Sequence, residues 1–341
     1  MSELPSEGAR PLPLSVAHKL TVALGAALAS LSLLTVSGRA HAEPSQLPPE
    51  LAYNSAETDT PRSLATASAM RAQGIGTTAL FYNPANMAVT RAYHITALAQ
   101  IYPEAGRQSY GGAIVDSIVS SSGLAGGIGG TWNLQDPDGL GREWMDIRGG
   151  FALPVGRLFY IGAGGRIFSL IQNGGGPLGR SPIAGGLDGQ MIVNTFTLDL
   201  GATFKPLPEL SISITGHNLT NPGTGFLPLM AGIGVGYGRQ EFSLDLDAVL
   251  DSTTYEQPTA RVMFGGEFLA AGVVAVRAGY RYEQGLDLHS ISTGLGYIDR
   301  RFSVDAAFRR TVSGVEATAL VFGFTLHIEN ISLGSEPGSL D

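Results

Sequence analysis

Hydrophobic and polar residues alternate one by one along most of the chain after about residue 91. In residues 195–204 (TFTLDLGATF), one set of alternate positions is apolar and the other carries Thr, Asp and Gly. The same period of two recurs in residues 242–250 (FSLDLDAVL) and 302–309 (FSVDAAFR). Successive side chains of a β-strand point to opposite faces, so this pattern predicts strands with one apolar and one more polar face.

The alternation predicts fourteen strands, most of them 10–14 residues long. They are expected at residues 92–101, 109–119, 124–134, 144–153, 158–171, 191–204, 209–218, 228–237, 240–250, 259–268, 273–283, 288–298, 301–311 and 317–328. Strands of globular proteins usually have about five or six residues, whereas a tilted strand that crosses a membrane needs about 9–11. The strand length therefore favours a membrane barrel.

Connections between the predicted strands differ in length on the two sides. Tight turns are expected at residues 154–157, 205–208, 238–239, 269–272 and 299–300. The intervening connections are mostly longer and polar, and the longest spans residues 172–190. Short turns on one side and longer loops on the other are typical of outer-membrane barrels. We therefore predict an all-β fold, a 14-stranded antiparallel transmembrane β-barrel over residues 91–329, with a C-terminal tail at 330–341.

The start of the chain has the pattern of an export signal. Residues 20–36 are apolar or small, follow Lys19 and precede the sequence A-H-A at residues 40–42. This pattern predicts a cleaved signal peptide over residues 1–42, with an N-terminal membrane anchor as the alternative. Export argues against a soluble sandwich, which would bury its apolar face between two sheets. A closed barrel pairs every backbone group in lipid, so we expect an outer-membrane location.

Composition agrees with this architecture. Only 15% of the residues are charged, 47 of 341 are glycine, and there is no cysteine. Charges are expected to be few when about half of the strand positions face lipid, and glycines allow a wall to approach other backbone closely. Without cysteine there is no disulfide, thiolate metal site or cysteine nucleophile. The net charge of −8 argues against a nucleic-acid partner.

The segment before the first strand has a different composition. Residues 43–62 are rich in Pro and polar residues and predict a periplasmic leader, whereas residues 63–90 are rich in small residues. A barrel of fourteen strands is too wide to be filled by wall side chains alone. We therefore expect residues 63–90 to form a hatch, or plug, inside the barrel.

The string ALFYNPANMA at residues 79–88, ahead of fourteen strands, resembles the hatch motif of the FadL/PorV outer-membrane superfamily. Further similar stretches are Val115-Asp116-Ser117, Gly216-His217-Asn218-Leu219-Thr220 with Pro228-Leu229, and Arg277-Ala278-Gly279-Tyr280. The resemblance covers the chain from about residue 63. It implies a fourteen-stranded barrel with an internal hatch, in which Asn83, Pro84 and Ala85 shape the hatch.

The resemblance implies two possible functions. One branch of the superfamily moves long-chain fatty acids and other hydrophobic molecules, and the PorV branch carries secreted proteins to a surface secretion machinery. The glycine-rich loop 172–190 differs from the hydrophobic capture loops of the fatty-acid transporters, which argues against direct fatty-acid transport. We predict an outer-membrane channel or carrier for small hydrophobic solutes. The alternative is a PorV-like barrel that binds secretion or surface-complex proteins.

Charged residues on the polar strand faces are expected to line the lumen. They are Asp199, Asp245, Asp247, Asp305, Arg277, Arg281 and Arg309, together with Arg148, Arg166, Arg261 and Glu267. Cross-barrel salt bridges are the first interpretation and a polar solute path is the second. Asp245 and Asp247 share one strand face and repel each other, so one of them is expected to pair with an arginine or to have a raised pKa.

Two further groups of residues have alternative interpretations. Four glycines of the third strand either kink it, opening a lateral window, or pack against the hatch, which we favour: Gly126, Gly127, Gly129 and Gly130. Aromatic residues near strand ends predict a girdle at the membrane surface: Tyr93, Tyr102, Trp144, Tyr160, Tyr237, Tyr280 and Tyr297.

Catalysis is not expected. The strand histidines His94, His217, His289 and His327 lie on separate strands without a nucleophile motif, and neither HExxH nor a histidine pair with metal-ligand spacing occurs. We predict no catalytic residue, metal or cofactor. The expected partners are membrane lipid, a hydrophobic solute and, for the alternative function, secretion or surface-complex proteins.

Overall fold

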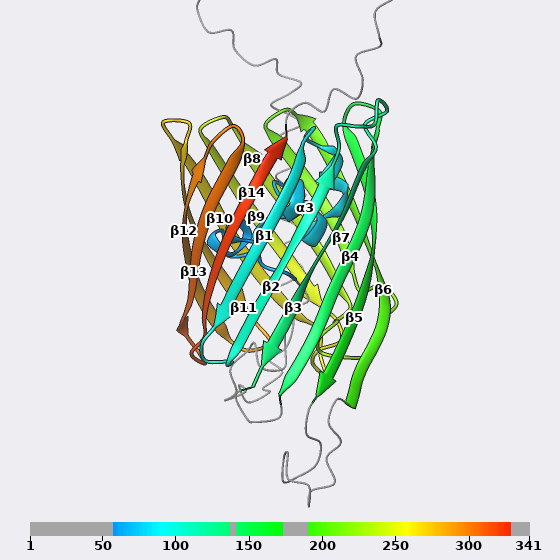
Figure 1. The fold of residues 1–341 in the computed structure, drawn as a ribbon, viewed down its shortest axis with the longest axis vertical. Helices are drawn as coiled ribbons and strands as arrows, with labels where there is room; N and C mark the ends of the chain where they lie inside the picture. The colour runs from blue at the N-terminus through cyan, green and yellow to red at the C-terminus, as the bar shows by residue number, and fades with distance from the viewer. Residues whose placement is uncertain (1–56, 137–140, 173–189, 329–341) are drawn as a thin grey trace, which may run out of the picture. The chain divides into compact units, whose positions relative to one another are not determined.

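Fourteen antiparallel strands form a closed barrel in the computed structural model, which describes residues 57–136, 141–172 and 190–328 (Figure 1). The first seven are β1 (Tyr93–Tyr102), β2 (Arg107–Asp116), β3 (Ala125–Gln135), β4 (Arg142–Val155), β5 (Phe159–Gln172), β6 (Gln190–Leu207) and β7 (Leu210–His217). The others are β8 (Met230–Gly238), β9 (Phe242–Asp251), β10 (Thr259–Ala270), β11 (Val274–Glu283), β12 (Leu288–Ile298), β13 (Phe302–Ser313) and β14 (Thr318–Ile328). The predicted fold class is confirmed, and no strand boundary differs from its expected position by more than three residues.

The barrel closes where the last strand meets the first. β1 pairs with β14 from Tyr93↔Ile328 to Ile101↔Leu320, and every other strand pairs with its neighbours in sequence. β1 begins and β14 ends at the same end of the barrel, where most connections have two or three residues. We call this the short-turn end and the opposite one the long-loop end.

Alternation along each strand separates an outer apolar face from an inner polar face. On β7, the Ile214 side chain is 63% exposed, whereas its neighbours Ser213 and Thr215 are buried. Large exposed apolar side chains occur on all fourteen strands. This arrangement is the reverse of a soluble protein and is that of a barrel surrounded by lipid. Among the described residues, no helix is both long enough and apolar enough to span a membrane.

Residues 57–90, here called the inner segment, are buried within the ring of strands (Figure 1). They contain α2 (Pro61–Ala65), α3 (Gly76–Tyr82) and the 3-10 helix η2 (Pro84–Ala88). α2 contacts β11 to β14, α3 contacts β1 to β4, and η2 contacts β3 to β6. Residues 57–62, expected in the periplasmic leader, already belong to this buried segment. That the segment acts as a hatch stays a prediction.

Short polar side chains define the helices of the inner segment. At the start of α2, the Thr60 hydroxyl accepts a hydrogen bond from Ser63 N (3.2 Å), and Ser63 Oγ accepts one from Thr60 N (2.8 Å). Pro61 occupies the first helical position, where no N–H is needed. Asn83 ends α3, and its side chain accepts from Ala85 N at 3.1 Å to begin η2. These capping bonds hold helices of only five to seven residues.

Several predictions fall outside the described residues. They concern the signal peptide at 1–42, the greater part of the leader at 43–62, loop residues 173–189 and the tail at 330–341.

Candidate functional site: the barrel interior

Two carboxylates of β9 hold the backbone of the inner segment. Asp247 Oδ2 accepts hydrogen bonds from Met70 N and Arg71 N at 2.9 Å each, and from Arg71 Nη1 at 3.4 Å. Asp245 Oδ1 accepts from Gln73 N at 3.1 Å. A buried carboxylate persists only when such partners compensate for lost water. Of the acidic pair that the sequence places on one strand face, Asp247 pairs with an arginine, and this arginine belongs to the inner segment.

The Asn83-Pro84-Ala85 turn lies against two glycines of the barrel wall. Gly162 of β5 and Gly201 of β6 are directly paired. A Cβ at Gly162 would lie 2.8 Å from Ala85 Cα, and one at Gly201 would lie 3.2 Å from Pro84 Cδ and overlap Asn83 Oδ1. Only glycine leaves room for this approach of turn to wall. The predicted motif thus packs against a defined site on the barrel wall, formed by Gly162 and Gly201.

Asparagine side chains connect the turn to the acidic anchor. Asn83 Nδ2 donates to the Arg71 carbonyl (2.8 Å) and to Thr203 Oγ1 (2.9 Å). Asn86 Nδ2 donates to the same carbonyl at 2.9 Å, while Thr203 Oγ1 donates to Asn86 Oδ1 at 2.6 Å. Arg71 is therefore held by Asp247 through its N–H and by two asparagines through its C=O.

Charged side chains of β4 to β7 form a network on the inner wall. Arg166 Nε donates to Asp146 Oδ1 at 2.7 Å, and Arg148 Nη1 lies 3.8 Å from Asp199 Oδ2. His217 Nδ1 lies 3.4 Å from the same Asp199 oxygen. All five residues are buried. Of these, Asp146 and His217 had not been included among the charged lumen residues, although both lie at inward positions of their strands.

The remaining predicted lumen residues are also paired. Arg277 bridges Glu267 (2.5 Å) and Asp305 (2.6 Å), and Arg281 pairs with Glu283 (3.1 Å). A further ion pair joins wall and inner segment, with Arg309 Nη1 3.2 Å from Asp59 Oδ2. Together with the contacts of Asp199, Asp245 and Asp247, these ion pairs join nearby strands of the wall or join the wall to the inner segment. That the charged residues line a solute path stays a prediction.

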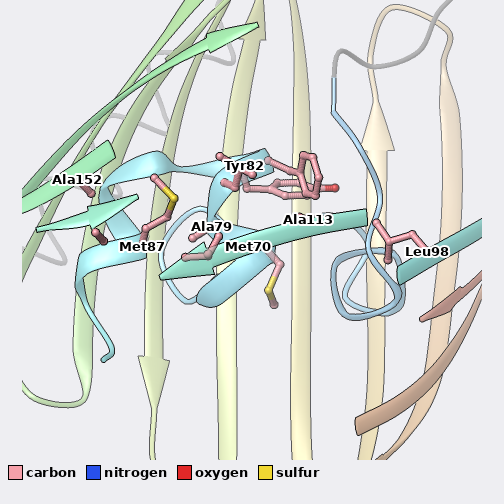
Figure 2. Packing of buried hydrophobic residues seen from close by; sticks show 11 residues of the cluster. Met70, Ala79, Tyr82, Met87, Leu98, Ala113 and Ala152 are labelled. Atoms are coloured by element: carbon pink, nitrogen blue, oxygen red, sulfur yellow. The ribbon is translucent and has the colours of Figure 1, made fainter. Parts of the chain in front are cut away.

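Apolar contacts hold the inner segment against β1 to β4. Met87 and Tyr82 lie among small wall residues, including Ala113 and Ala152, with Met70 and Leu98 nearby (Figure 2). On β3, Ala125 belongs to this cluster, and a Cβ added at Gly127 would lie 3.2 Å from Met87 Sδ. β3 pairs with β2 and β4 without a register shift. The third-strand glycines therefore leave the wall continuous here. Gly127 lies against the inner segment, whereas the nearest neighbours of Gly126 and Gly130 are backbone atoms of β4, so the close-packing interpretation does not hold for all four glycines.

A second apolar cluster lies at the long-loop end, with Trp144 of β4, Phe168 and Leu170 of β5, and Phe226 and Leu227 of the β7–β8 connection. We call it the aromatic cluster. The Phe226 ring lies against Trp144 and Phe168, with ring centroids 5.7 and 5.5 Å apart. Leu227 is fully buried although it belongs to a connection. This cluster was not predicted, because the connection was expected to be a polar external loop.

Two members of the expected aromatic girdle face inward instead. Tyr102 and Trp144 are 2% and 1% exposed, so their assignment to a lipid-facing girdle was wrong. The Arg107 guanidinium lies 3.7 Å from the Tyr102 ring centre and 5.7 Å from that of Trp144. The guanidinium stacks on electron-rich ring faces there. Tyr280 and Tyr297 remain on the outer surface, 43% and 49% exposed.

Histidines of the first and last strands meet at the barrel closure. His94 and His327 are register partners, with ring centroids 4.7 Å apart in an edge-to-face arrangement. Over the described ranges, no group of three His, Asp or Glu side chains has the geometry of a metal site.

Comparison with known proteins identifies the fold. The monoaromatic hydrocarbon channel CymD superposes with a TM-score of 0.61 at 13% identity, over 81% of this chain and 98% of CymD. The barrel has the FadL-type fold. The toluene transporter TbuX of Ralstonia pickettii gives a TM-score of 0.57 at 14% identity, over 80% of this chain and 99% of TbuX. A FadL homologue of Pseudomonas aeruginosa gives 0.53 at 15% identity, over 80% and 98%.

The sequence itself matches no protein-family model and no curated protein. These structural neighbours are described as transport channels or as a FadL homologue, and none of the three is described as an enzyme. They give no support to a secretion-complex partner.

Proposed function

We propose that this protein is an outer-membrane channel for small hydrophobic solutes. The observation that carries the proposal is the aromatic cluster. A polar barrel interior has no need of a buried tryptophan and phenylalanines at its mouth, and such side chains form the usual lining of sites for apolar ligands. The Phe226 ring contacts both Trp144 and Phe168, so a planar apolar solute that displaced this ring would meet the same two aromatic neighbours.

The neighbours support the same class of solute. Two of them are described as a monoaromatic hydrocarbon channel and a toluene transporter. Toluene is close in size to the phenylalanine side chain that fills the aromatic cluster. We therefore propose small aromatic hydrocarbons as the solute class, entering where Phe226 and Leu227 yield.

A second part of the proposal concerns the inner segment. Solute must pass residues 57–90, so transport requires this segment to shift from the wall. Thr77 of α3 and Thr96 of β1 have hydroxyl oxygens 2.8 Å apart. The double variant Thr77→Cys/Thr96→Cys therefore places two sulfurs within disulfide reach in a chain that has no other cysteine.

The test is toluene uptake into proteoliposomes. Wild-type protein is expected to accelerate uptake over empty liposomes, the oxidised double variant to slow it, and reductant to restore it. The control is Thr96→Cys/Thr325→Cys, which carries the same Thr96→Cys change but joins β1 to β14, through hydroxyl positions 3.0 Å apart, and leaves the inner segment unlinked. That control should pass toluene at the wild-type rate when oxidised.

Two results would count against the proposal in different ways. If the wild-type protein accelerates the uptake of neither toluene, longer alkanes nor fatty acids, the proposed channel function is rejected. Equal toluene uptake by the oxidised and the reduced Thr77→Cys/Thr96→Cys variant would reject only the proposal that the inner segment has to move.

A further inference from the structure

A separate pocket lies at the short-turn end, on the other side of the inner segment from the aromatic cluster. Its volume is about 270 Å³, and it is lined by residues 72–75 and 89–90 of the inner segment and by the ends of β6, β8, β9, β10 and β12. This volume is near the low end for small-molecule sites. The pocket therefore suits a small molecule and is too short for a long acyl chain.

Hydrogen-bond donors without acceptors meet in this pocket. Arg62 binds Glu267 through Nη2 at 3.0 Å, but its buried Nε has no acceptor among the described residues. The buried Gln73 Nε2 likewise has none within those ranges. Buried donors are normally satisfied, so these two atoms require an acceptor from outside the chain or from water.

A third donor adds a charge. Lys205 lines the same pocket from the inner face of β6 and is half-buried; no described carboxylate lies within ion-pair distance of its ammonium group, although the charge of Glu209 attracts it. It is the only lysine after Lys19 in the whole sequence. The nearby carboxylate of Glu267 already accepts from Arg62 and Arg277, and Glu241 is exposed at the rim. Donors thus outnumber free acceptors.

Part of the pocket wall is apolar. Ile75 and Val89 of the inner segment face Phe242, Leu269 and Ile298 of the barrel across the same space. A fully hydrated anion gains nothing from such a surface, whereas a carboxylate with a small apolar body satisfies both parts of the lining. We propose that this pocket binds a small organic carboxylate, with Lys205, Arg62 and Gln73 as the oxygen-binding groups. The site shares no residue with the aromatic cluster.

The experiment is calorimetric titration of benzoate into the full-length protein in a neutral detergent at pH 7.5, where benzoate is ionised. We expect saturable binding with one site. Lys205→Gln should weaken it at least about tenfold, since a hydrogen bond to a charged group is lost. Lys205→Arg should retain most of the affinity. Toluene binding to the same variants should not change.

The matched control is Arg157→Gln, which removes an exposed positive charge from the β4–β5 turn at the same end of the barrel. It should bind benzoate like wild type, and equal weakening by both variants would reduce the effect to general attraction of anions. Absence of saturable binding overturns the proposal, and so does inorganic phosphate that binds as tightly as benzoate. Neither outcome bears on toluene uptake, so this test and that of the channel function fail independently.

Discussion

The barrel interior contains two packed regions that are built on opposite principles. The inner segment is held by directional polar bonds, such as those of Asp247, and by glycines that accept its backbone. The aromatic cluster is held by apolar contacts between β4, β5 and one connection. Apolar contacts have no required direction, so a solute can replace Phe226 without leaving polar groups unpaired. Moving the inner segment would break buried ion pairs, so we expect it to be harder to displace than Phe226.

The largest effect is expected from Asp247→Ala. The change removes three hydrogen bonds and leaves the Arg71 charge with only part of its partners, at a cost of about 3–5 kcal/mol in unfolding free energy. Urea unfolding in detergent measures the cost. Hydrogen exchange over residues 57–90 should rise more than that of the strands.

Asp245→Asn is the matched control for Asp247→Ala. Asp245 accepts one backbone hydrogen bond, from Gln73 N, and an amide oxygen can still accept it. The substitution also removes a charge that repels Asp247. If both variants lower the unfolding free energy equally, the hydrogen bonds of Asp247 are not the main attachment of the inner segment to β9.

Gly162→Ala should have the next largest effect. The added methyl group would overlap the Asn83-Pro84-Ala85 turn and cost about 1–3 kcal/mol, with raised exchange in η2. Gly164→Ala, two positions along β5, is the control, because its nearest atom would lie 3.4 Å away. Similar destabilisation by the two variants would show that the change in unfolding free energy comes from the strand propensity of alanine and not from overlap with the turn.

Phe226→Ala tests the apolar contacts of the aromatic cluster. Loss of two ring contacts should cost about 1 kcal/mol and leave exchange in the inner segment unchanged. In a Trp132→Phe background, which leaves Trp144 as the sole tryptophan, the emission should shift to longer wavelength as water enters. Leu219→Ala, an exposed residue of the same connection, should leave the emission unaltered. If Phe226→Ala raises hydrogen exchange in the inner segment, the aromatic cluster and the inner segment are not held independently.

The smallest effect concerns pH. Glu104, in the β1–β2 connection, accepts from Thr318 N (2.9 Å) and Thr318 Oγ1 (2.7 Å) and pairs with Arg310 (2.7 Å). Partial burial opposes its charged form, but these hydrogen bonds and the Arg310 charge outweigh burial and lower the pKa of Glu104. Its stabilisation is therefore present above the unfolded-state pKa and is lost as pH falls through the lowered one.

We expect Glu104→Gln to cost about 0.5–1 kcal/mol at pH 7, because the site is partly exposed. The difference from wild type should shrink towards zero below about pH 4, near the ordinary range of glutamate. Urea unfolding at pH 7 and pH 3 measures it. A difference that is constant over this range would assign the effect to packing.

The fold was predictable because side-chain alternation is a local property of the strand. The alternation also indicates which face of a strand each aromatic residue lies on. Trp144 shares its face with Asp146 and Arg148, and Tyr102 shares its face with Leu98 and Gln100, so counting by two places both rings inside the barrel. Their position near strand ends had suggested a girdle, although the girdle requires outward parity as well.

Other features had no local signal. Alternation fixes the face of Asp247 but not the height in the barrel at which it meets Arg71, 176 residues away. The pairing of Gly162 with Gly201 depends on the register between β5 and β6, which the loop between them does not reveal. Phe226 and Leu227 are two apolar residues in a connection, and only the folded wall shows what they cover.

The position of the inner segment constrains how the molecule is assembled. α3 contacts the first strands and α2 contacts the last, so the segment spans the place where β1 and β14 join. Because the segment contacts strands on both sides of this junction, we expect its packing and the β1–β14 pairing to stabilise each other.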